Sequence, residues 1–217
     1  MNMRSIQNYF MNLFRPARAQ AIGARFPLLN DPNARVLDVG GGSYPWDLLN
    51  PAARVTILNK SRPPTVPEGA RWEFVIGDGT SLEYPDRSFD LVFSNSVIEH
   101  VGDLEAQTKF ANEMRRVGKH LYCQTPNRWF PVEPHLIALI IHWFPSSVVR
   151  RLARYGSVWG WATKPNRQQV DEFLSLIRLL SFKEFSQLYP DCDIRRERVF
   201  GLTKSFIAER IAQDIDR

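Results

Sequence analysis

One stretch decides the fold of this 217-residue chain: Val36-Leu37-Asp38-Val39-Gly40-Gly41-Gly42-Ser43. Its apolar first half predicts a buried strand, and three consecutive glycines follow that strand at once. Glycine lets the backbone turn sharply and lets a ligand approach main-chain N–H groups. In open α/β sheets such a turn lies at the carboxyl end of the first strand, where ligands bind. The stretch therefore predicts a ligand-binding turn in an α/β protein.

The residues around the glycines narrow the kind of ligand. The dinucleotide pattern G-x-G-x-x-G would need glycine at position 45, where Pro45 stands, and no Gly-Lys-Ser/Thr of a P-loop occurs. The acidic Asp38, directly before the turn, suits a ligand with a cationic amine. A glycine triplet alone also occurs in turns that bind no ligand. Further motifs in the chain are therefore needed to distinguish a ligand-binding turn from a purely structural one.

Outward from this turn, strand and helix patterns alternate. The sequence predicts a helix over 104–117 and further strands over 54–59, 72–76, 89–93 and 120–124. This alternation is typical of a parallel sheet with covering helices. Near the C-terminus we expect a helix over 168–180 and two antiparallel strands over 194–200 and 205–208.

The chain reads as a single domain with four parts. A helical cap over 1–30 precedes a core over 35–125, and a lid segment over 126–165 precedes the C-terminal helix and strands over 166–217. The lid segment holds four of the six tryptophans and is expected to lie over the open carboxyl edge of the sheet. In the cap, Ile6, Phe10, Leu13 and Phe14 recur at roughly helical spacing.

Composition excludes several classes of protein. Hydrophobic residues make up 44% and charged residues 24%, as in ordinary globular domains, and no apolar run is long enough to span a membrane. Residues 1–14 lack the apolar core of a secretory signal. Two cysteines, Cys123 and Cys192, make neither a disulfide framework nor a thiolate zinc site. We therefore expect a reduced, cytoplasmic compartment.

The net charge of +5 is unevenly placed. Residues 1–30 and 134–170 together contain nine basic residues and no acidic residue. Such local basic surfaces suit anionic substrates, membrane headgroups or nucleic acid, and they also occur as ordinary solvated surface.

Three further motifs follow the glycine turn in order: Gly77-Asp78-Gly79-Thr80-Ser81-Leu82, Asp86-Arg87-Ser88-Phe89-Asp90-Leu91-Val92 and Ser94-Asn95-Ser96-Val97-Ile98-Glu99-His100-Val101. Over residues 35–127 the chain resembles the class I S-adenosylmethionine-dependent methyltransferases, in particular the small-molecule, ubiquinone-biosynthesis-like (type 11) group. Weaker similarity covers residues 201–205. The resemblance implies a Rossmann-like, doubly wound sheet of seven strands with the last strand antiparallel, and S-adenosylmethionine as cofactor.

The resemblance also implies roles for single residues. Asp38, Gly40 and Gly42 would line the methionine end of the cofactor, and Asn95 would lie near the methionine moiety or the substrate. The adenine amino group would be bound by a second set: Asp78, with Gly79 and Thr80 beside it.

Two positions depart from the family pattern. Tyr44 stands where glycine is usual, and Asn59 stands where an acid usually holds the ribose hydroxyls. A neutral amide bonds a hydroxyl more weakly than a carboxylate does, so some loss of cofactor affinity is expected.

Candidate catalytic residues follow the fourth strand. His100 is the first candidate for a general base, because imidazole titrates near neutral pH. Glu99 and His135 are expected at the same edge of the sheet. In some relatives such a Glu-His pair with a later histidine holds a divalent metal, although here Ser96 replaces a further acidic ligand. A structural role for Glu99 and His100 stays open beside the base and the metal.

The lid segment suggests what the acceptor is. Its first residues, 125–135, are rich in proline and carry Asn127, Arg128, Glu133 and His135 as candidate acceptor contacts. Residues 136–144 are apolar, and Arg150, Arg151 and Arg154 follow, which suits either a packed lid or a helix at the face of an anionic membrane.

Together these patterns predict methyl transfer to a small-molecule or lipid-like acceptor, most readily at oxygen. The alternatives are a non-catalytic cofactor-binding relative and an RNA-directed methyltransferase. Nucleic acid is disfavoured because Ser94-Asn95-Ser96-Val97 stands where base-methylating enzymes carry an Asn-Pro-Pro-Tyr motif.

Overall fold

The computed structural model describes residues 15–61, 72–133 and 135–212; the predicted apolar pattern of residues 6–14 lies outside the described residues. The described chain forms a seven-stranded sheet with strand order β3-β2-β1-β4-β5-β9-β8. The strands are β1 (Arg35–Val39), β2 (Arg54–Asn59), β3 (Trp72–Ile76), β4 (Phe89–Asn95), β5 (Gly118–Pro126), β8 (Asp193–Val199) and β9 (Leu202–Arg210). Strands β1 to β5 are parallel, and β9 runs antiparallel to β5 and β8. The predicted sheet is confirmed.

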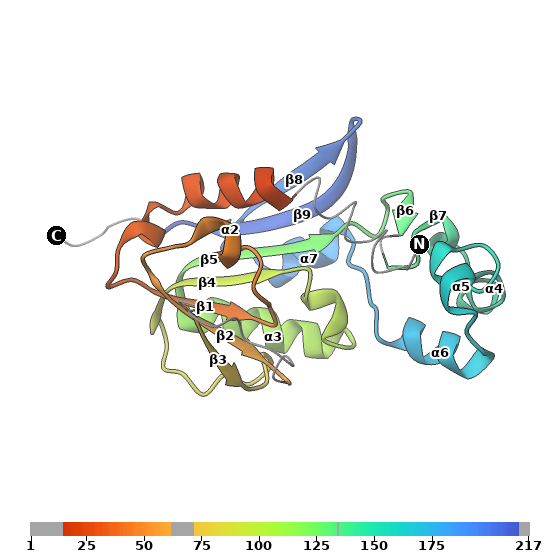
Figure 1. The fold of residues 1–217 in the computed structure, drawn as a ribbon, viewed down its shortest axis with the longest axis horizontal. Helices are drawn as coiled ribbons and strands as arrows, with labels where there is room; N and C mark the ends of the chain where they lie inside the picture. The colour runs from red at the N-terminus through yellow and green to blue at the C-terminus, as the bar shows by residue number, and fades with distance from the viewer. Residues whose placement is uncertain (1–14, 62–71, 134, 213–217) are drawn as a thin grey trace.

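Helices cover both faces of the sheet (Figure 1). One face carries the helix over 15–25 and the short helix α2 (Trp46–Leu49), and the other carries α3 (Leu104–Val117) and α7 (Phe182–Leu188). Phe110 and Phe185 join the cluster on the α3 side, and Phe26 and Trp46 join the other. Burial on both sides explains why β1 and β4 read as near-continuous apolar runs.

The helix predicted over 104–117 is found at those bounds. Its N-cap is Asp103, whose side chain accepts from the backbone N–H of Ala106 at 2.9 Å. Phe110, Met114 and Val117 lie on one buried face of the helix and pack on the sheet. This packing holds the loop 96–103, which carries Glu99 and His100, against the carboxyl ends of the strands.

The lid segment lies beyond the carboxyl ends of the parallel strands (Figure 1). It has a small apolar core of its own, to which Trp159 and, from the next helix, Val170 contribute. Trp159 stacks on Phe173 with ring centroids 4.3 Å apart. Its elements are β6 (Val132–Glu133), β7 (Ala138–Leu139), η3 (Ile141–Trp143), α4 (Ser146–Leu152) and α5 (Val158–Thr163), and α6 (Arg167–Ser175) packs against them.

The helix predicted over 168–180 ends early, at Ser175. The chain then returns to the sheet in irregular conformation, and Leu180 packs in the main core rather than on the helix face. The backbone of Arg178 finds its partners there, donating to Glu99 O at 2.8 Å and accepting from Gln107 Nε2 at 2.9 Å. These bonds to the core replace the hydrogen bonds that Arg178 would make in a longer helix. The local sequence does not indicate this replacement, because Glu99 and Gln107 are distant along the chain. Helix α7 follows from a capping box of Ser181 and Glu184 and was not predicted.

In the described part of the chain, no helix combines the length and the apolar character that crossing a bilayer requires.

Candidate active site

The turn after β1 is held by contacts that only glycine allows. Gly40 has φ +80°, and a Cβ added there would stand 2.3 Å from Cγ1 of Val97. A Cβ on Gly41 would stand 2.1 Å from Oδ2 of Asp38. The first two glycines of the triplet are therefore required by close approach, as the sequence predicts for a turn of this kind.

Asp38 lies fully buried behind this turn. Trp46 Nε1 donates to Oδ2 at 2.7 Å, whereas Oδ1 has no partner among the described residues. Burial raises the pKa of Asp38 to about 8, and the bond from Trp46 only partly opposes that rise. The carboxyl group thus supports the turn from beneath and does not line the cavity in front of it, so its contact with the cofactor stays a prediction. Sequence reasoning missed Trp46, because nothing in its local sequence indicates that its indole N–H bonds Asp38.

A cavity of about 220 Å³ opens at the carboxyl ends of β1 to β4, in front of the turn. We call it the sheet-edge cavity. It brings together Gly40, Asn59, Asp78, Gly79, Thr80 and His100 from the predicted site, and Lys60, Val97 and Phe110 besides.

Asp78 is the acidic group among the described residues that line this cavity. Its Oδ1 accepts from the N–H and the hydroxyl of Thr80 at 2.9 and 2.8 Å, and its Oδ2 lies 3.4 Å from Lys60 Nζ. The backbone bond from Thr80, against partial desolvation, lowers the pKa of Asp78, so the carboxylate is ionised at neutral pH. Its free lone pairs remain able to accept from a ligand N–H.

Asn59 uses its amide to hold the glycine turn. Its Nδ2 donates to Gly40 O and Gly41 O, both at 3.2 Å, and its Oδ1 accepts from Lys60 N at 2.8 Å. A carboxylate could not donate to those two carbonyls. The departure from the family pattern therefore has a structural reason in this chain.

Two other predicted contacts lie outside the cavity wall. Gly42 is exposed, and a Cβ there would meet nothing within 4 Å. Asn95 Oδ1 accepts from Arg18, on the helix over 15–25, at 3.4 Å. Tyr44 likewise turns toward that helix, where its hydroxyl donates to Arg15 O. The cofactor roles of Gly42 and Asn95 stay predictions.

His100 connects the sheet-edge cavity to the lid segment. Its Nε2 lies 3.1 Å from Nε2 of His135, and the two rings are edge to face at 88°. His135 Nδ1 lies 2.6 Å from Glu133 Oε1, and His100 Nδ1 lies 3.3 Å from Leu176 O. The other carboxylate oxygen of Glu133 accepts from the backbone N–H of Leu136. Glu133, His135 and His100 thus form a continuous relay.

The partners at Nδ1 decide where the protons lie. A carboxylate faces His135 Nδ1 and a carbonyl faces His100 Nδ1, so both Nδ1 atoms carry hydrogen. In two neutral rings the Nε2 lone pairs then face each other, and one proton between them turns that repulsion into a hydrogen bond. The pair is therefore built to take up a single proton.

The pKa shifts agree with this arrangement. Burial lowers the pKa of His135, but the bond and charge of Glu133 outweigh it and raise the pKa overall. Burial, and then the charge of His135, lower the pKa of His100. Glu133 is itself 3% exposed, and its hydrogen bonds to His135 hold its pKa low against burial. The shared proton therefore resides on His135.

Glu99 lies beside this pair and is fully buried. Its Oε2 accepts from Thr125 Oγ1 at 3.0 Å, and its Oε1 has no partner among the described residues. Burial raises the pKa of Glu99 to about 7. One ligand atom each of Glu99, His100 and His135 lies within 4.8 Å of the others, so the predicted set does come together and has the donor types of a divalent-metal site.

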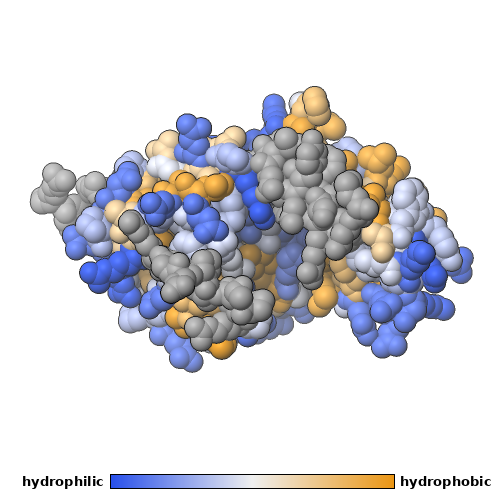
Figure 2. Space-filling model, in the orientation of Figure 1, coloured by the Kyte–Doolittle hydropathy of each residue, from blue (hydrophilic) through white to orange (hydrophobic). Residues whose placement is uncertain are grey.

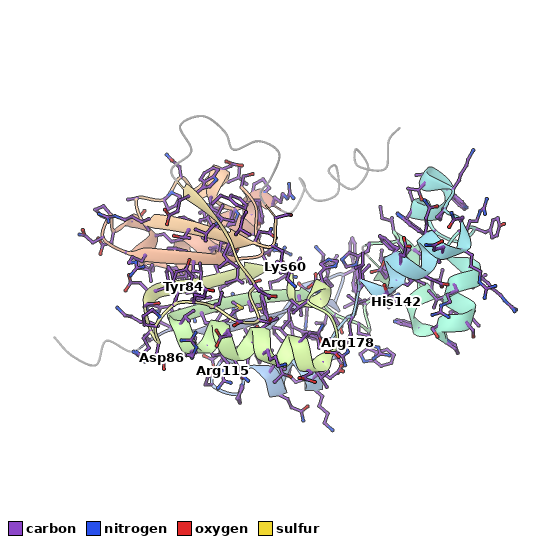
Figure 3. The ribbon with its side chains drawn as sticks, turned by 90° about the horizontal axis from the view of Figure 1, so that it is seen from below. Lys60, Tyr84, Asp86, Arg115, His142 and Arg178 are labelled. Carbon is purple, nitrogen blue, oxygen red and sulfur yellow. The ribbon has the colours of Figure 1, made fainter. Side chains whose placement is uncertain are left out.

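A second cavity, of about 240 Å³, lies between the lid segment and the returning chain 174–179; we call it the lid cavity. Its walls are mainly aliphatic, and Arg128, Glu133, His142 and Arg178 add polar groups. Figure 3 shows His142 and Arg178 at the junction of core and lid. His142 Nε2 lies 2.9 Å from Arg128 O, and its Nδ1 is buried without a hydrogen-bond partner among the described residues. Glu133 lines this cavity and His100 the other, so the relay joins the two.

The family of the chain agrees with this geometry. Residues 11–185 match a family model described as a methyltransferase domain, and the chain belongs to that family. The resemblance seen in the sequence is thereby confirmed at the level of S-adenosylmethionine-dependent methyltransferases. The assignment to the ubiquinone-biosynthesis-like group stays a prediction.

Solved structures share the fold at low identity. One is a magnesium protoporphyrin IX methyltransferase from Synechocystis PCC 6803 with bound S-adenosylhomocysteine, which superposes with a TM-score of 0.56 at 12% identity. The match covers 96% of this chain and 87% of the Synechocystis chain. A 1,6-didemethyltoxoflavin-N1-methyltransferase from Burkholderia thailandensis has a TM-score of 0.53 at 18% identity, covering 90% and 76%. Both confirm the class I methyltransferase architecture.

One curated relative matches in sequence. Phosphoethanolamine N-methyltransferase 3 of Arabidopsis thaliana is 28% identical over 109 residues. The match covers 44% of this chain and 22% of the relative, so the chain corresponds to a small part of that protein.

Proposed function

We propose that the protein transfers a methyl group from S-adenosylmethionine to a hydroxyl of a small, amphiphilic acceptor. The observation that carries the proposal is the relay from Glu133 through His135 to His100, which joins a glycine-lined cavity at the sheet edge to a largely aliphatic cavity in the lid.

The sheet-edge cavity fits the cofactor. Gly40 lines the cavity, Asp78 offers a carboxylate, and Lys60 lies beside Asp78. When bound, the cofactor supplies an activated methyl group on a sulfonium, so the protein has mainly to align the acceptor and remove its proton. The negative charge of the cavity comes from Asp78, whose lowered pKa keeps it ionised at neutral pH and which favours a cationic ligand.

The histidine pair removes that proton. In its unprotonated form the pair has two converging Nε2 lone pairs, and a hydroxyl beside His100 can give its proton to them. The charge that forms on His135 is stabilised by Glu133 at 2.6 Å. Deprotonation is most needed for a hydroxyl acceptor, which is why we favour oxygen over nitrogen.

The lid cavity fits the acceptor. Leu136, Val149, Leu174 and Ile177 suit an apolar body, whereas Arg128 and the free Nδ1 of His142 suit a polar end. Two of the similar proteins, the 1,6-didemethyltoxoflavin-N1-methyltransferase and phosphoethanolamine N-methyltransferase 3, are N-methyltransferases, which makes nitrogen the second candidate for the acceptor atom.

The first experiment is calorimetric titration with S-adenosylmethionine and S-adenosylhomocysteine. Micromolar binding of both, about −8 kcal/mol at 1 μM, supports the cofactor site. Absence of binding would favour the non-catalytic alternative, with Asn59 and Tyr44 as the residues to examine.

Transfer is then assayed with labelled cofactor and a panel of phenolic and lipid-linked hydroxyls, with amines and RNA alongside. His100→Ala should reduce the rate roughly 10²- to 10⁴-fold and leave affinity for S-adenosylhomocysteine unchanged. Glu133→Gln should move the acidic limb of the pH–rate profile to lower pH, because it removes the charge that raises the pKa of His135. An unshifted profile contradicts the relay, and loss of activity with a chelator would favour the metal site instead.

A further inference from the structure

The lid segment carries a third cavity, of about 390 Å³, between α4 and the start of α6. It is separate from the two cavities of the proposed reaction. Four arginines line it, Arg150, Arg151, Arg154 and Arg167, with Tyr155 beside them. Among ion pairs between described residues, only Arg150 of these four takes part, at 2.8 Å from Asp171. Asp171 thus offsets the charge of Arg150, and the other three arginines concentrate positive charge at the cavity.

Exposed apolar side chains gather on the same segment. Residues 129–161 hold nine of the 17 large apolar side chains that are exposed in the described chain. Tyr155 and Trp161 are 70% and 65% exposed, and Trp161 Nε1 donates to Tyr155 O at 2.5 Å, so the two are neighbours. Figure 2 shows apolar and hydrophilic surface side by side at this end of the molecule. Such exposed apolar groupings are typical of interaction sites.

The two features coincide at the arginines and aromatic residues of α4 and α5. Arg154 lies over the ring of Tyr155 at 5.6 Å, and Leu152 is exposed on the same helix as Arg150 and Arg151. We call Arg150, Arg151, Arg154, Tyr155, Trp161 and Arg167 the arginine–aromatic surface. Interfacial membrane anchors typically place tyrosine and tryptophan at the depth of the lipid headgroups and direct arginine toward the lipid phosphates.

We propose that the arginine–aromatic surface binds the face of a bilayer that contains anionic phospholipid. The arginines around the cavity bind lipid phosphates, and Tyr155 and Trp161 enter the headgroup region. Charge complementarity supports this occupant, because three of the four arginines at the cavity form no ion pair with a described residue. Exposed aliphatic side chains, Leu139 and Leu152, favour lipid over single-stranded nucleic acid, which stacks its bases on aromatic rings.

The test is flotation of the whole chain with vesicles of phosphatidylcholine, alone or with roughly 30 mol % phosphatidylglycerol. We expect binding to the anionic vesicles only, weakened when salt is raised from about 0.1 to 0.5 M. Arg151→Glu with Arg154→Glu should weaken binding at least about tenfold. The matched control is Arg54→Glu with Arg198→Glu, which makes the same change in net charge at exposed positions on the sheet, outside the lid. This variant should bind the vesicles as the wild type does. Equal loss in both, or equal binding to neutral vesicles, overturns the proposal.

Depth of contact gives a second, independent measurement. Brominated phosphatidylglycerol quenches tryptophans that enter a bilayer, so Trp161→Phe should reduce quenching, whereas Trp159→Phe, at a buried position, should not. If quenching is absent and single-stranded RNA binds the wild type more tightly than the vesicles do, the surface binds nucleic acid and the membrane proposal is wrong.

Discussion

The core and the lid segment of this protein bury their apolar residues to very different extents. In the core, strands β1 and β4 lie between two layers of helices, and Val36, Leu37, Leu91 and Phe93 are fully buried. In the lid, one cluster of seven buried side chains supports several short elements, and many large apolar side chains stay exposed. We therefore expect the core to be more stable against local unfolding than the lid. The exposed side chains of the lid are available to bind a partner such as the proposed bilayer.

The proposed active site lies where these two regions meet. His100 and Glu99 come from the core, and His135 and Glu133 come from the lid. The backbone bond from Arg178 to Glu99 O fastens the returning chain at the same place. The chemistry therefore depends on docking of the lid, whereas the sheet-edge cavity belongs to the core.

The largest effect should follow from weakening the lid core. Trp159→Ala removes a stacked, largely buried ring and should lower the stability of the lid by about 3 kcal/mol. Amide exchange in residues 136–175 should then accelerate, methyl transfer should fall, and affinity for S-adenosylhomocysteine should stay unchanged.

Trp161→Ala is the matched control, because this tryptophan of the same helix is 65% exposed. It should alter stability by no more than about 0.5 kcal/mol. If Trp159→Ala instead destabilises core and lid together, the two regions unfold as one and the contrast between them fails.

The next effect concerns the core platform. Gly40→Ala places a Cβ against Val97 at a position with φ +80°, so the turn must shift. Calorimetry should show that affinity for S-adenosylhomocysteine falls on the order of 10- to 100-fold. Gly42→Ala, where a Cβ meets nothing within 4 Å, should stay within about twofold of the wild type. Equal losses would mean that Gly42 binds the cofactor after all, as the family resemblance implies.

The last effect is the pH dependence of core stability. The pKa of Asp38 rises from 3.8 to about 8 on folding, so the folded state keeps a proton that the unfolded state releases. Stability should therefore fall progressively as pH rises from about 4 to about 8. Asp38→Asn cannot ionise, so urea unfolding across this range should show a flatter curve for the variant. Parallel curves would contradict the raised pKa.

Much of the core could be predicted from the sequence. The strands over 35–39, 54–59 and 72–76 and the helix over 104–117 have the predicted bounds, because buried parallel strands and amphipathic helices leave strong local patterns. The expectation that Glu99, His100 and His135 meet at one edge is also met by the structure. The helix over 168–180 was predicted too long, because bonds to Glu99 and Gln107, distant in sequence, end it.

The sequence by itself determined the sheet, the glycine turn and the family, since each depends on residues that are neighbours along the chain or repeat at a fixed period. Tertiary structure alone decided that Trp46 supports Asp38, that Asn59 holds the turn, and that Glu133 charges the histidine pair. It also decided that Trp161 lies beside Tyr155 on an exposed surface. Such pairings depend on the direction of side chains brought together by folding, and no periodicity along the chain records that direction.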